Sequence, residues 1–125
     1  MVGYYFDSYA LIELIRGNEN YKPYIHTEGI FTFLNLIECY HSWLYELGEE
    51  KANFYFSFFK KYCVPVMDDD IKNGVKLRIK MRNQNKFYKP SFVDCIGYII
   101  ALRFGVKFLT GDNAFKDMDN VEFVK

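Results

Sequence analysis

The chain has 125 residues, half of them hydrophobic and a fifth aromatic, which excludes disorder and predicts a single domain over residues 1–125. Sixteen basic residues balance sixteen acidic ones, so the overall charge points to no partner. No apolar run reaches the roughly 18 residues of a membrane span, and no signal peptide is evident, so we expect a cytoplasmic protein without a membrane partner. The three cysteines form no C-x-x-C pair and are expected to be free thiols.

The chain opens with a predicted strand and helix. The short aromatic run Val2–Phe6 predicts a strand that ends at Asp7. Apolar spacing then predicts a helix that stops at Arg16-Gly17, with Ser8 as its candidate cap. Asp7 is therefore expected at the carboxyl end of a strand, just before a helix begins. In open α/β sheets, ligands bind at that edge.

A second strand and a long helix follow. Residues 18–28 are polar and predict a connection with at most a short helix, and residues 29–31 predict a strand. A long helix is expected over residues 33–47, and Gly48 ends it. Glu38 lies in the early part of this helix.

The next predicted helix, residues 49–62, is rich in aromatic side chains. Its aromatic residues are Phe54, Tyr55, Phe56, Phe58, Phe59 and Tyr62, and the preceding helix adds Tyr40 and Trp43. They cover an arc that is wide for one contact with a core. Two interpretations stay open, an ordinary aromatic core and an interface with a subunit or partner.

The middle of the chain is less regular. Residues 63–67 predict a third short strand, in which Pro65 favours an edge position or an early place in the strand. Asp68-Asp69-Asp70 resembles a metal cluster, but at a helix start these acids are more often caps and dipole partners. Residues 71–82 fit both strand and helix spacing, and the segment's length and acidic start favour a helix.

A helix with one acid in its first turn is expected near residue 91. Ser91 is a good N-cap, Asp94 completes the capping-box pattern, and the apolar helix ends at Gly105. Asp94 is either a cap stabilised by the helix dipole or a metal ligand at the rim of the core.

The remaining segments complete an alternating pattern. Residues 106–109 predict a strand, 110–113 a loop, 114–118 a turn or short helix, and 121–124 a last strand. Strands that alternate with helices predict a parallel α/β sheet with helices on both faces.

Four acids have matching positions in this scheme. Asp7 and Asp112 follow strands, whereas Glu38 and Asp94 lie early in helices, so all four are expected at one edge of a parallel sheet. Like charges a few ångströms apart cannot all stay ionised without a counter-charge. A hard cation, Mg²⁺ or Mn²⁺, takes oxygen ligands and keeps waters, which leaves room for a phosphate.

The segments that carry these acids resemble the motifs of the PIN domain family. Tyr5–Ile12 looks like the family's first strand with its Asp-Ser/Thr ending, and Thr32–Glu38 looks like the second acidic motif. Ser91–Asp94 is similar to the third motif, Leu109–Phe115 to the fourth, and Val121–Val124 to the closing strand. The resemblance covers essentially the whole chain in order, and the compact length is most similar to VapC-type toxins of prokaryotic toxin–antitoxin pairs.

This resemblance implies a three-layer α/β/α fold around a mainly parallel sheet of four to five strands. It implies a metal-dependent endoribonuclease with Asp7, Glu38, Asp94 and Asp112 around Mg²⁺ (or Mn²⁺). Ser8 and Thr110, at the family's hydroxyl positions, would hydrogen-bond ligands or water. It also implies a homodimer and a cognate antitoxin that covers the aromatic helices or inserts into the site.

Two residues depart from the family pattern. Tyr9 stands where a small or amide residue is frequent, and Gly111 makes the fourth motif looser. Neither departure removes an acid.

The only strongly polarised stretch runs from Lys72 to Lys89, with seven basic residues and no acid. On the nuclease interpretation the RNA backbone binds to Lys80, Arg82, Lys86 and Lys89. Tyr88 or Phe87 is then a candidate to stack a base. The bland alternative is a solvated helix face.

Other assignments stay open or are modest. A housekeeping PIN nuclease in RNA maturation and a non-catalytic PIN-like binding module are the alternatives to a toxin. Asp117 and Asp119 either support the metal ligands or lie on the surface, and the surface interpretation is favoured, while His26 and His41 receive no role.

Overall fold

The computed structural model describes residues 2–125, so Met1 of the predicted domain lies outside the described residues. The elements in order are β1 (Val2–Phe6), α1 (Ser8–Arg16), the 3-10 helix η1 (Glu19–Tyr24), β2 (Glu28–Ile30), α2 (Phe33–Leu47), α3 (Glu49–Lys60), α4 (Asp68–Gln84), α5 (Phe92–Phe104), β3 (Lys107–Thr110), the 3-10 helix η2 (Asn113–Phe115) and β4 (Val121–Phe123).

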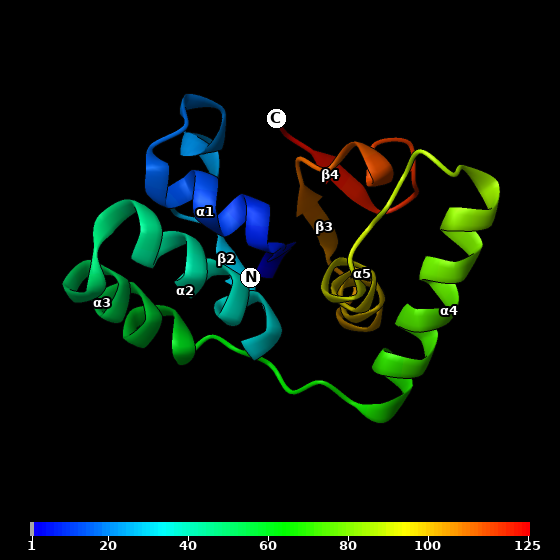
Figure 1. The fold of residues 1–125 in the computed structure, drawn as a ribbon, viewed down its shortest axis with the longest axis horizontal. Coiled ribbons are helices and arrows are strands. Elements are labelled where there is room, and N and C mark those ends of the chain that lie inside the picture. The colour runs from blue at the N-terminus through cyan, green and yellow to red at the C-terminus, as the bar shows by residue number, and fades with distance from the viewer. Residues whose placement is uncertain (1) are drawn as a thin grey trace.

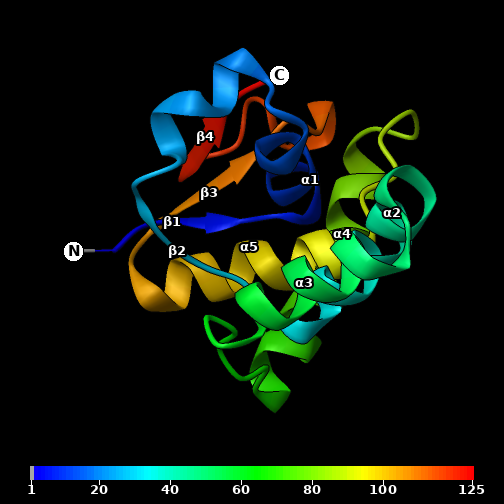
Figure 2. The same cartoon turned by 90° about the vertical axis from the view of Figure 1, so that its left-hand side faces the viewer.

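The four strands form one parallel sheet in the order β2-β1-β3-β4. Figure 1 shows α1 and α5 on opposite sides of this sheet, and both helices contact β1 and β3. The second helix on each side packs outside the first, α2 on α1 and α4 on α5. Figure 2, turned by 90°, shows α5 running beneath the strands. The predicted three-layer α/β/α architecture with a parallel sheet is therefore confirmed.

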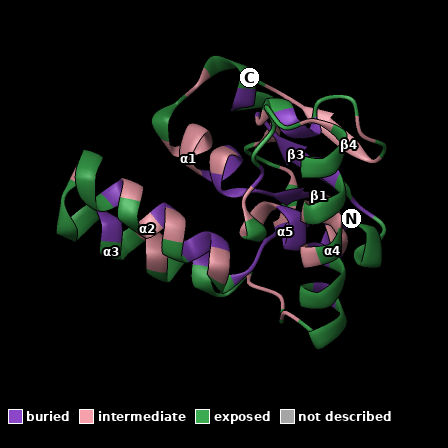
Figure 3. Ribbon diagram, turned by 45° about the vertical axis from the view of Figure 1, so that its right-hand side comes forward, coloured by how far each residue is buried: buried purple, intermediate pink, exposed green. Residues whose placement is uncertain are grey.

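Aromatic side chains from the central strands and α5 form the core. Tyr5 of β1 and Phe108 of β3 have no exposed surface, and their rings stack at 5.8 Å between centroids. Phe108 also contacts the rings of Tyr98 and Phe115. Figure 3 shows the buried residues on α5 and the central strands, whereas most of α4 is exposed. The strand ends that carry polar residues are thus anchored in a rigid apolar layer.

Local signals account for most helix boundaries. Thr32 caps α2 and Ser91 caps α5, and each side chain accepts a backbone N–H of the first turn. Gly105 ends α5 in the left-handed conformation, at φ 69°, which glycine adopts without steric cost. The predicted cap at Ser8 was wrong, because Asp7 caps α1 and Ser8 is the first helical residue.

The acidic start of α4 behaves as a cap, which the sequence predicted. The Asp70 carboxylate accepts the backbone N–H of Met67 at 2.8 Å and pairs with Arg103 of α5 at 2.8 Å. The predicted helix over residues 71–82 is also confirmed.

Residues 63–67 do not form the predicted strand. Cys63 makes a single bridge to Phe31, and the Val64 N–H donates to the Phe31 carbonyl at 2.8 Å. Pro65 has no N–H with which to extend the ladder, so the chain runs on in extended form to α4. The preceding helix also ends earlier than predicted, at Lys60.

The aromatic side chains of α2 and α3 divide between the two interpretations. Trp43 and Phe59 are buried and stacked at 5.7 Å, which makes them part of the core. Phe54, Phe58 and the following Tyr62 are exposed. None of the helices between residues 2 and 125 combines the length and apolar character needed to cross a membrane.

Candidate active site

The four predicted acids lie at the carboxyl edge of the parallel sheet. Asp7 directly follows β1 and is 1% exposed, and Asp112 follows the end of β3. Glu38 lies in the first half of α2, and Asp94 in the first turn of α5, and both are partly buried. Because strands carry these residues to one edge and the helices start there, acids far apart in sequence come within electrostatic range of one another.

Asp7 is held by both of its carboxylate oxygens. Oδ1 accepts the Ala10 N–H at 2.7 Å as the cap of α1, and Oδ2 accepts the Thr110 hydroxyl. The same Thr110 oxygen accepts the Asp112 N–H at 3.0 Å. Thr110 therefore ties the ends of β1 and β3 together and fixes the position of both acids. The Thr110 hydroxyl was predicted to hydrogen-bond ligands or water, and here it donates to the Asp7 carboxylate.

A second hydroxyl performs the same task for Glu38. Ser8 Oγ donates to Glu38 Oε1 at 2.6 Å and accepts from Asn35 Nδ2 at 3.1 Å. Asn35 is completely buried, and its Oδ1 accepts the Tyr5 hydroxyl and the Thr32 N–H. The chain of hydrogen bonds joins β1, α1 and α2 around one carboxylate.

Sequence reasoning gave Asn35 no role. A capping-box position, Thr32-x-x-Asn35, was the available signal, since the amide oxygen reaches back to the cap N–H. The same amide also reaches Ser8 and Tyr5, which no local pattern indicates.

Burial and mutual repulsion raise the pKa of two of these acids. Burial is the largest cause of the high pKa of Asp7, and the nearby charges of Asp94 and Asp112 raise it further. The pKa of Asp94 rises to about 7, first through burial and then through the charges of Glu38 and Asp112. Hydrogen bonds from Thr110 to Asp7 and from Ser91 to Asp94 oppose these shifts without cancelling them.

The acidic cluster has no basic partner among the residues that the structure describes. Among residues 2–125, Asp7, Glu38, Asp94 and Asp112 form no ion pair with a lysine or arginine. Within residues 2–125, no group of three or more His, Cys, Asp or Glu side chains lies close enough together to hold a metal ion. The donor set still fits Mg²⁺, which keeps several waters and is usually bound through one or two carboxylates and substrate phosphate.

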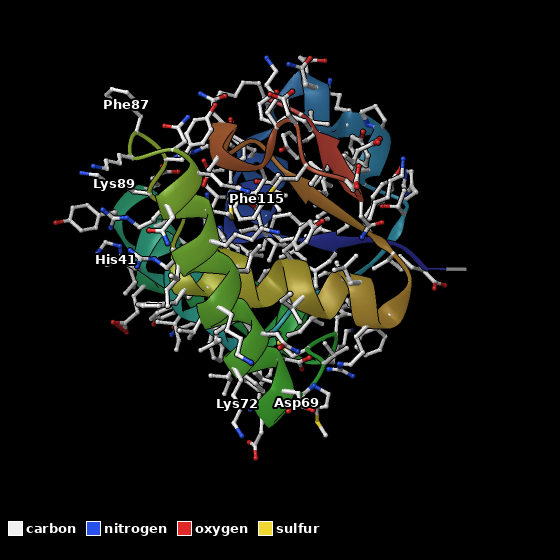
Figure 4. The ribbon with its side chains drawn as sticks, turned by 90° about the vertical axis from the view of Figure 1, so that its right-hand side faces the viewer. His41, Asp69, Lys72, Phe87, Lys89 and Phe115 are labelled. Atoms are coloured by element: carbon white, nitrogen blue, oxygen red, sulfur yellow. The ribbon has the colours of Figure 1, made fainter. Side chains whose placement is uncertain are left out.

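The predicted RNA-binding cations are accessible. Lys80 and Arg82 lie in the last turns of α4, Lys86 and Lys89 lie in the segment before α5, and all four are exposed. Figure 4 shows Phe87 and Lys89 projecting on the same side as His41 of α2, whereas Lys72 and Asp69 lie at the opposite end of α4. The basic stretch therefore runs along α4 toward the segment that leads into Asp94.

Arg78 has a structural task that the sequence did not indicate. Its Nε donates to the Pro90 carbonyl at 2.8 Å, and its guanidinium lies 4.5 Å from the centre of the Phe92 ring. Arg78 thereby fixes the approach to α5 and to Asp94.

The two departures from the family pattern pack against each other. A Cβ on Gly111 would lie only 2.2 Å from Cε1 of Tyr9, so the ring occupies the space that glycine leaves open. Lys125 donates to the Gly111 carbonyl at 2.8 Å and lies over the Tyr9 ring. The segment that carries Asp112 is thus held by Tyr9 and Lys125 as well as by Thr110.

The strand order, the layers and the acids at the sheet edge define a PIN-type α/β fold. No protein-family model matches the sequence, and no curated protein sequence does either. Solved structures match over essentially the full length, and they give the chain the fold of a VapC-type PIN domain.

Three of these structures illustrate the match. A chain of a toxin–antitoxin complex from Klebsiella pneumoniae is 18% identical with a TM-score of 0.73, and the match covers 96% of each chain. The sarcin–ricin loop cleaving toxin VapC20 of Mycobacterium tuberculosis is 13% identical with a TM-score of 0.77, over 98% of this chain and 100% of that one. VapBC2 from Rickettsia felis, bound to a DNA fragment from its promoter, is 12% identical with a TM-score of 0.70 over 100% of both chains.

Proposed function

We propose that the chain is a metal-dependent endoribonuclease and the toxin of a toxin–antitoxin pair. One observation carries the proposal: four acids lie at one sheet edge, two with pKa values raised by burial and by their neighbours, and no cation of the described chain pairs with them. Such a cluster stores charge that a divalent cation would neutralise. The fold shared with VapC20, which cleaves the sarcin–ricin loop, supports RNA as the substrate.

Asp7, Glu38, Asp94 and Asp112 would hold Mg²⁺ or Mn²⁺. When bound, such an ion supplies a Lewis acid that lowers the pKa of water and stabilises the leaving oxygen of a phosphodiester. The chain's own contribution is orientation, because Thr110 fixes Asp7, and Ser8 fixes Glu38.

The flanking cations would place the substrate. Lys80, Arg82, Lys86 and Lys89 are exposed and free of ion pairs within residues 2–125, so they are available to bind phosphates. These contacts position the RNA backbone and carry little sequence information. We place the activity in the cytoplasm, where RNA is abundant and the three free cysteines stay reduced.

The apolar surface of α2 and α3 supports a protein partner. Its exposed members are Phe33, Ile37, Leu44, Tyr45, Phe54, Phe58 and Tyr62. An apolar cavity of about 500 Å³ also opens between α1, β2 and the end of α3. A surface of this kind is typical of an interface, and we assign it to the antitoxin or to a second copy of the chain.

The test is cleavage of a mixed RNA pool with Mg²⁺, with Mn²⁺ or with EDTA. Wild type is compared with Asp94→Asn, which keeps the side chain's size and removes its charge. Asp69→Asn is the matched control, because it makes the same change in the first turn of α4, at the end of that helix remote from Lys89 (Figure 4). Metal-dependent cutting by wild type and the control, but not by Asp94→Asn, is the expected result.

Other outcomes identify the alternatives. Equal cutting by all three proteins would indicate a contaminant and leave Asp94 a helix-terminal acid. A folded wild type that binds RNA without cutting it would indicate a binding module. Growth arrest on expression, relieved by the product of a neighbouring small gene, separates a toxin from a housekeeping nuclease.

A further inference from the structure

A small cavity that the proposed chemistry does not use lies beside the candidate site. It has a volume of about 260 Å³ and opens between the C-terminal part of α4, the residues after it, and the segment that follows β3. Asn113 belongs to its rim and directly follows Asp112, so the rim begins one residue from the acidic cluster. Tyr88, in the segment after α4, also lines the cavity and lies six residues before Asp94. The cavity therefore adjoins the site on the side where the basic stretch ends.

The floor of the cavity is apolar and adaptable. Met81 and Ala114 are buried, while Leu77 and Met118 are partly buried. Two methionine side chains give a polarisable surface that adjusts to flat aromatic ligands. Tyr88 adds an accessible ring at the edge, which can stack on the face of such a ligand. Phe87, by contrast, is 93% exposed, is absent from the lining and projects into solvent (Figure 4).

Polar groups on the rim are available to a ligand. Asn85 Oδ1 accepts the Phe87 N–H at 2.9 Å, which leaves the Asn85 amide hydrogens to donate elsewhere. Within residues 2–125, the side chains of Gln84, Asn113 and Asp117 make no hydrogen bond to the protein. Asp117, interpreted from the sequence as a surface acid, is exposed and also lines the cavity. Ionised, it only accepts hydrogen bonds.

The charges around the cavity favour a nucleic acid. Lys80 and Asp117 both line the cavity, and Arg82, Lys86 and Lys89 are exposed along α4 and the following segment. These cations would bind the phosphates of a nucleic acid, while the cavity would receive a base of the same strand. Its volume lies below the range of roughly 300–1,000 Å³ that is common for sites of drug-sized ligands. A single nucleobase is a fitting occupant.

We propose that this cavity is a base-selective subsite, which seats one unstacked nucleobase of the RNA beside the scissile phosphate. Tyr88 stacks on the base, the methionines contact its other face, and Asp117 accepts a hydrogen bond from an exocyclic amino group. Adenine, cytosine and guanine carry such a group and uracil does not, so the subsite disfavours uracil. This proposal rests on the proposed function, since it assigns specificity to the same RNA.

The first test follows the cavity itself, without turnover. Methionine methyl groups labelled with ¹³C are observed by NMR in EDTA while the RNA pentamers UUAUU, UUCUU, UUGUU and UUUUU are added. We expect the Met81 and Met118 signals to shift, with affinities for the first three pentamers about fivefold or more above that for UUUUU. Met67, exposed at the start of α4 and outside the cavity, is the internal reference and should not shift.

Variants identify the groups responsible. Asp117→Asn, which can donate as well as accept, should abolish the discrimination against uracil. Asp119→Asn is the matched control, because it makes the same change two residues away, outside the cavity lining, and should keep the discrimination. Tyr88→Ala should weaken binding of all four pentamers by about fivefold or more, since stacking tolerates any base.

The second test reads the base preference next to the cut in a mixed RNA pool. Uracil should be depleted at one position flanking the cut in wild type and in Asp119→Asn, and should return in Asp117→Asn. Cleavage with an unchanged base profile in Asp117→Asn, or Met81 and Met118 signals that stay fixed with every pentamer, would overturn the subsite and leave the nuclease intact. Shifted methyl signals with the expected order of affinities, in a protein that cuts no RNA, would instead keep the subsite and refute the nuclease.

Discussion

Replacing Asp94 with asparagine should stabilise the metal-free protein. Burial and the charges of Glu38 and Asp112 raise the pKa of Asp94 from its ordinary 3.8 to about 7. The folded state therefore holds this proton more tightly than the unfolded state does. The resulting destabilisation is absent below about pH 4, grows as the pH rises to about 7, and stays constant above that. A shift of this size corresponds to about 4 kcal/mol at most, since each pKa unit is worth about 1.4 kcal/mol.

The expected gain is smaller than this limit for two reasons. Asp94 is partly exposed, so water relaxes around its charge, and the charge also interacts favourably with the start of α5, by about 0.3–1 kcal/mol. We expect Asp94→Asn to raise the free energy of unfolding by about 1–3 kcal/mol at pH 8 in EDTA. The backbone N–H of residue 94 still donates to Ser91, so the cap of α5 survives the change.

Urea unfolding in EDTA at pH 4.5 and pH 8 measures this effect. The advantage of Asp94→Asn should be largest at pH 8 and should shrink at pH 4.5, whereas Asp69→Asn, which loses only the interaction of an acid with a helix start, should show no gain in stability at either value. A variant that is less stable than wild type at pH 8, or an equal difference at both pH values, would refute the reasoning. Asp94 would then stabilise the start of α5, and repulsion by the other acids would be insignificant.

Three further predictions concern the same edge of the sheet. Thr110→Val keeps the shape of the side chain but leaves the Asp7 carboxylate and the Asp112 N–H without their partner. It should lower the free energy of unfolding in urea by about 1–3 kcal/mol and reduce RNA cleavage, and unchanged stability would contradict these hydrogen bonds. Gly111→Ala should lower the free energy of unfolding by about 1–3 kcal/mol, because the new methyl group overpacks against the Tyr9 ring. In a Tyr9→Ala background the same change should have little effect, and an equal loss in both backgrounds would contradict the contact. Millimolar Mg²⁺ or Mn²⁺ should raise the melting temperature of wild type at pH 8, since binding to the folded state alone stabilises it; the same rise in the variant without the Asp94 charge would place the ion elsewhere.

Helix boundaries were predictable because the residues that set them are local. Thr32 and Gly48 bracket α2 at the positions that the sequence predicted, through a side-chain cap and a glycine end. The prediction of a strand over residues 63–67 was wrong because it depended on apolar composition alone. Whether such a segment pairs depends on the partner strand and on free N–H groups, and Pro65 removes one of them after a single bridge.

The positions of the acids were predictable from topology, whereas their supporting contacts were not. A parallel sheet brings strand ends and helix starts to one edge, which sufficed to group Asp7 with Asp94. The hydroxyl that fixes Asp7 comes from Thr110, 103 residues away, and only resemblance pointed to it. The contacts of Asn35 with Ser8 and Tyr5, and the cavity position of Asp117, had no local signal, since they are built by segments that meet only in the folded chain.

The hydrogen bonds around the site show what the fold does and does not neutralise. Ser8 and Thr110 each donate the single hydroxyl hydrogen that they possess to a carboxylate, which orients the acids but removes no charge. Elsewhere the chain readily pairs a buried acid with a cation, as Asp70 with Arg103 shows. An acid with a purely structural role would also be stabilised by pairing with a cation, because a buried charge without a partner costs free energy. A divalent cation from outside the chain requires acids that are oriented but not neutralised. The same arrangement explains why these acids should destabilise the metal-free fold and still form the centre of its chemistry.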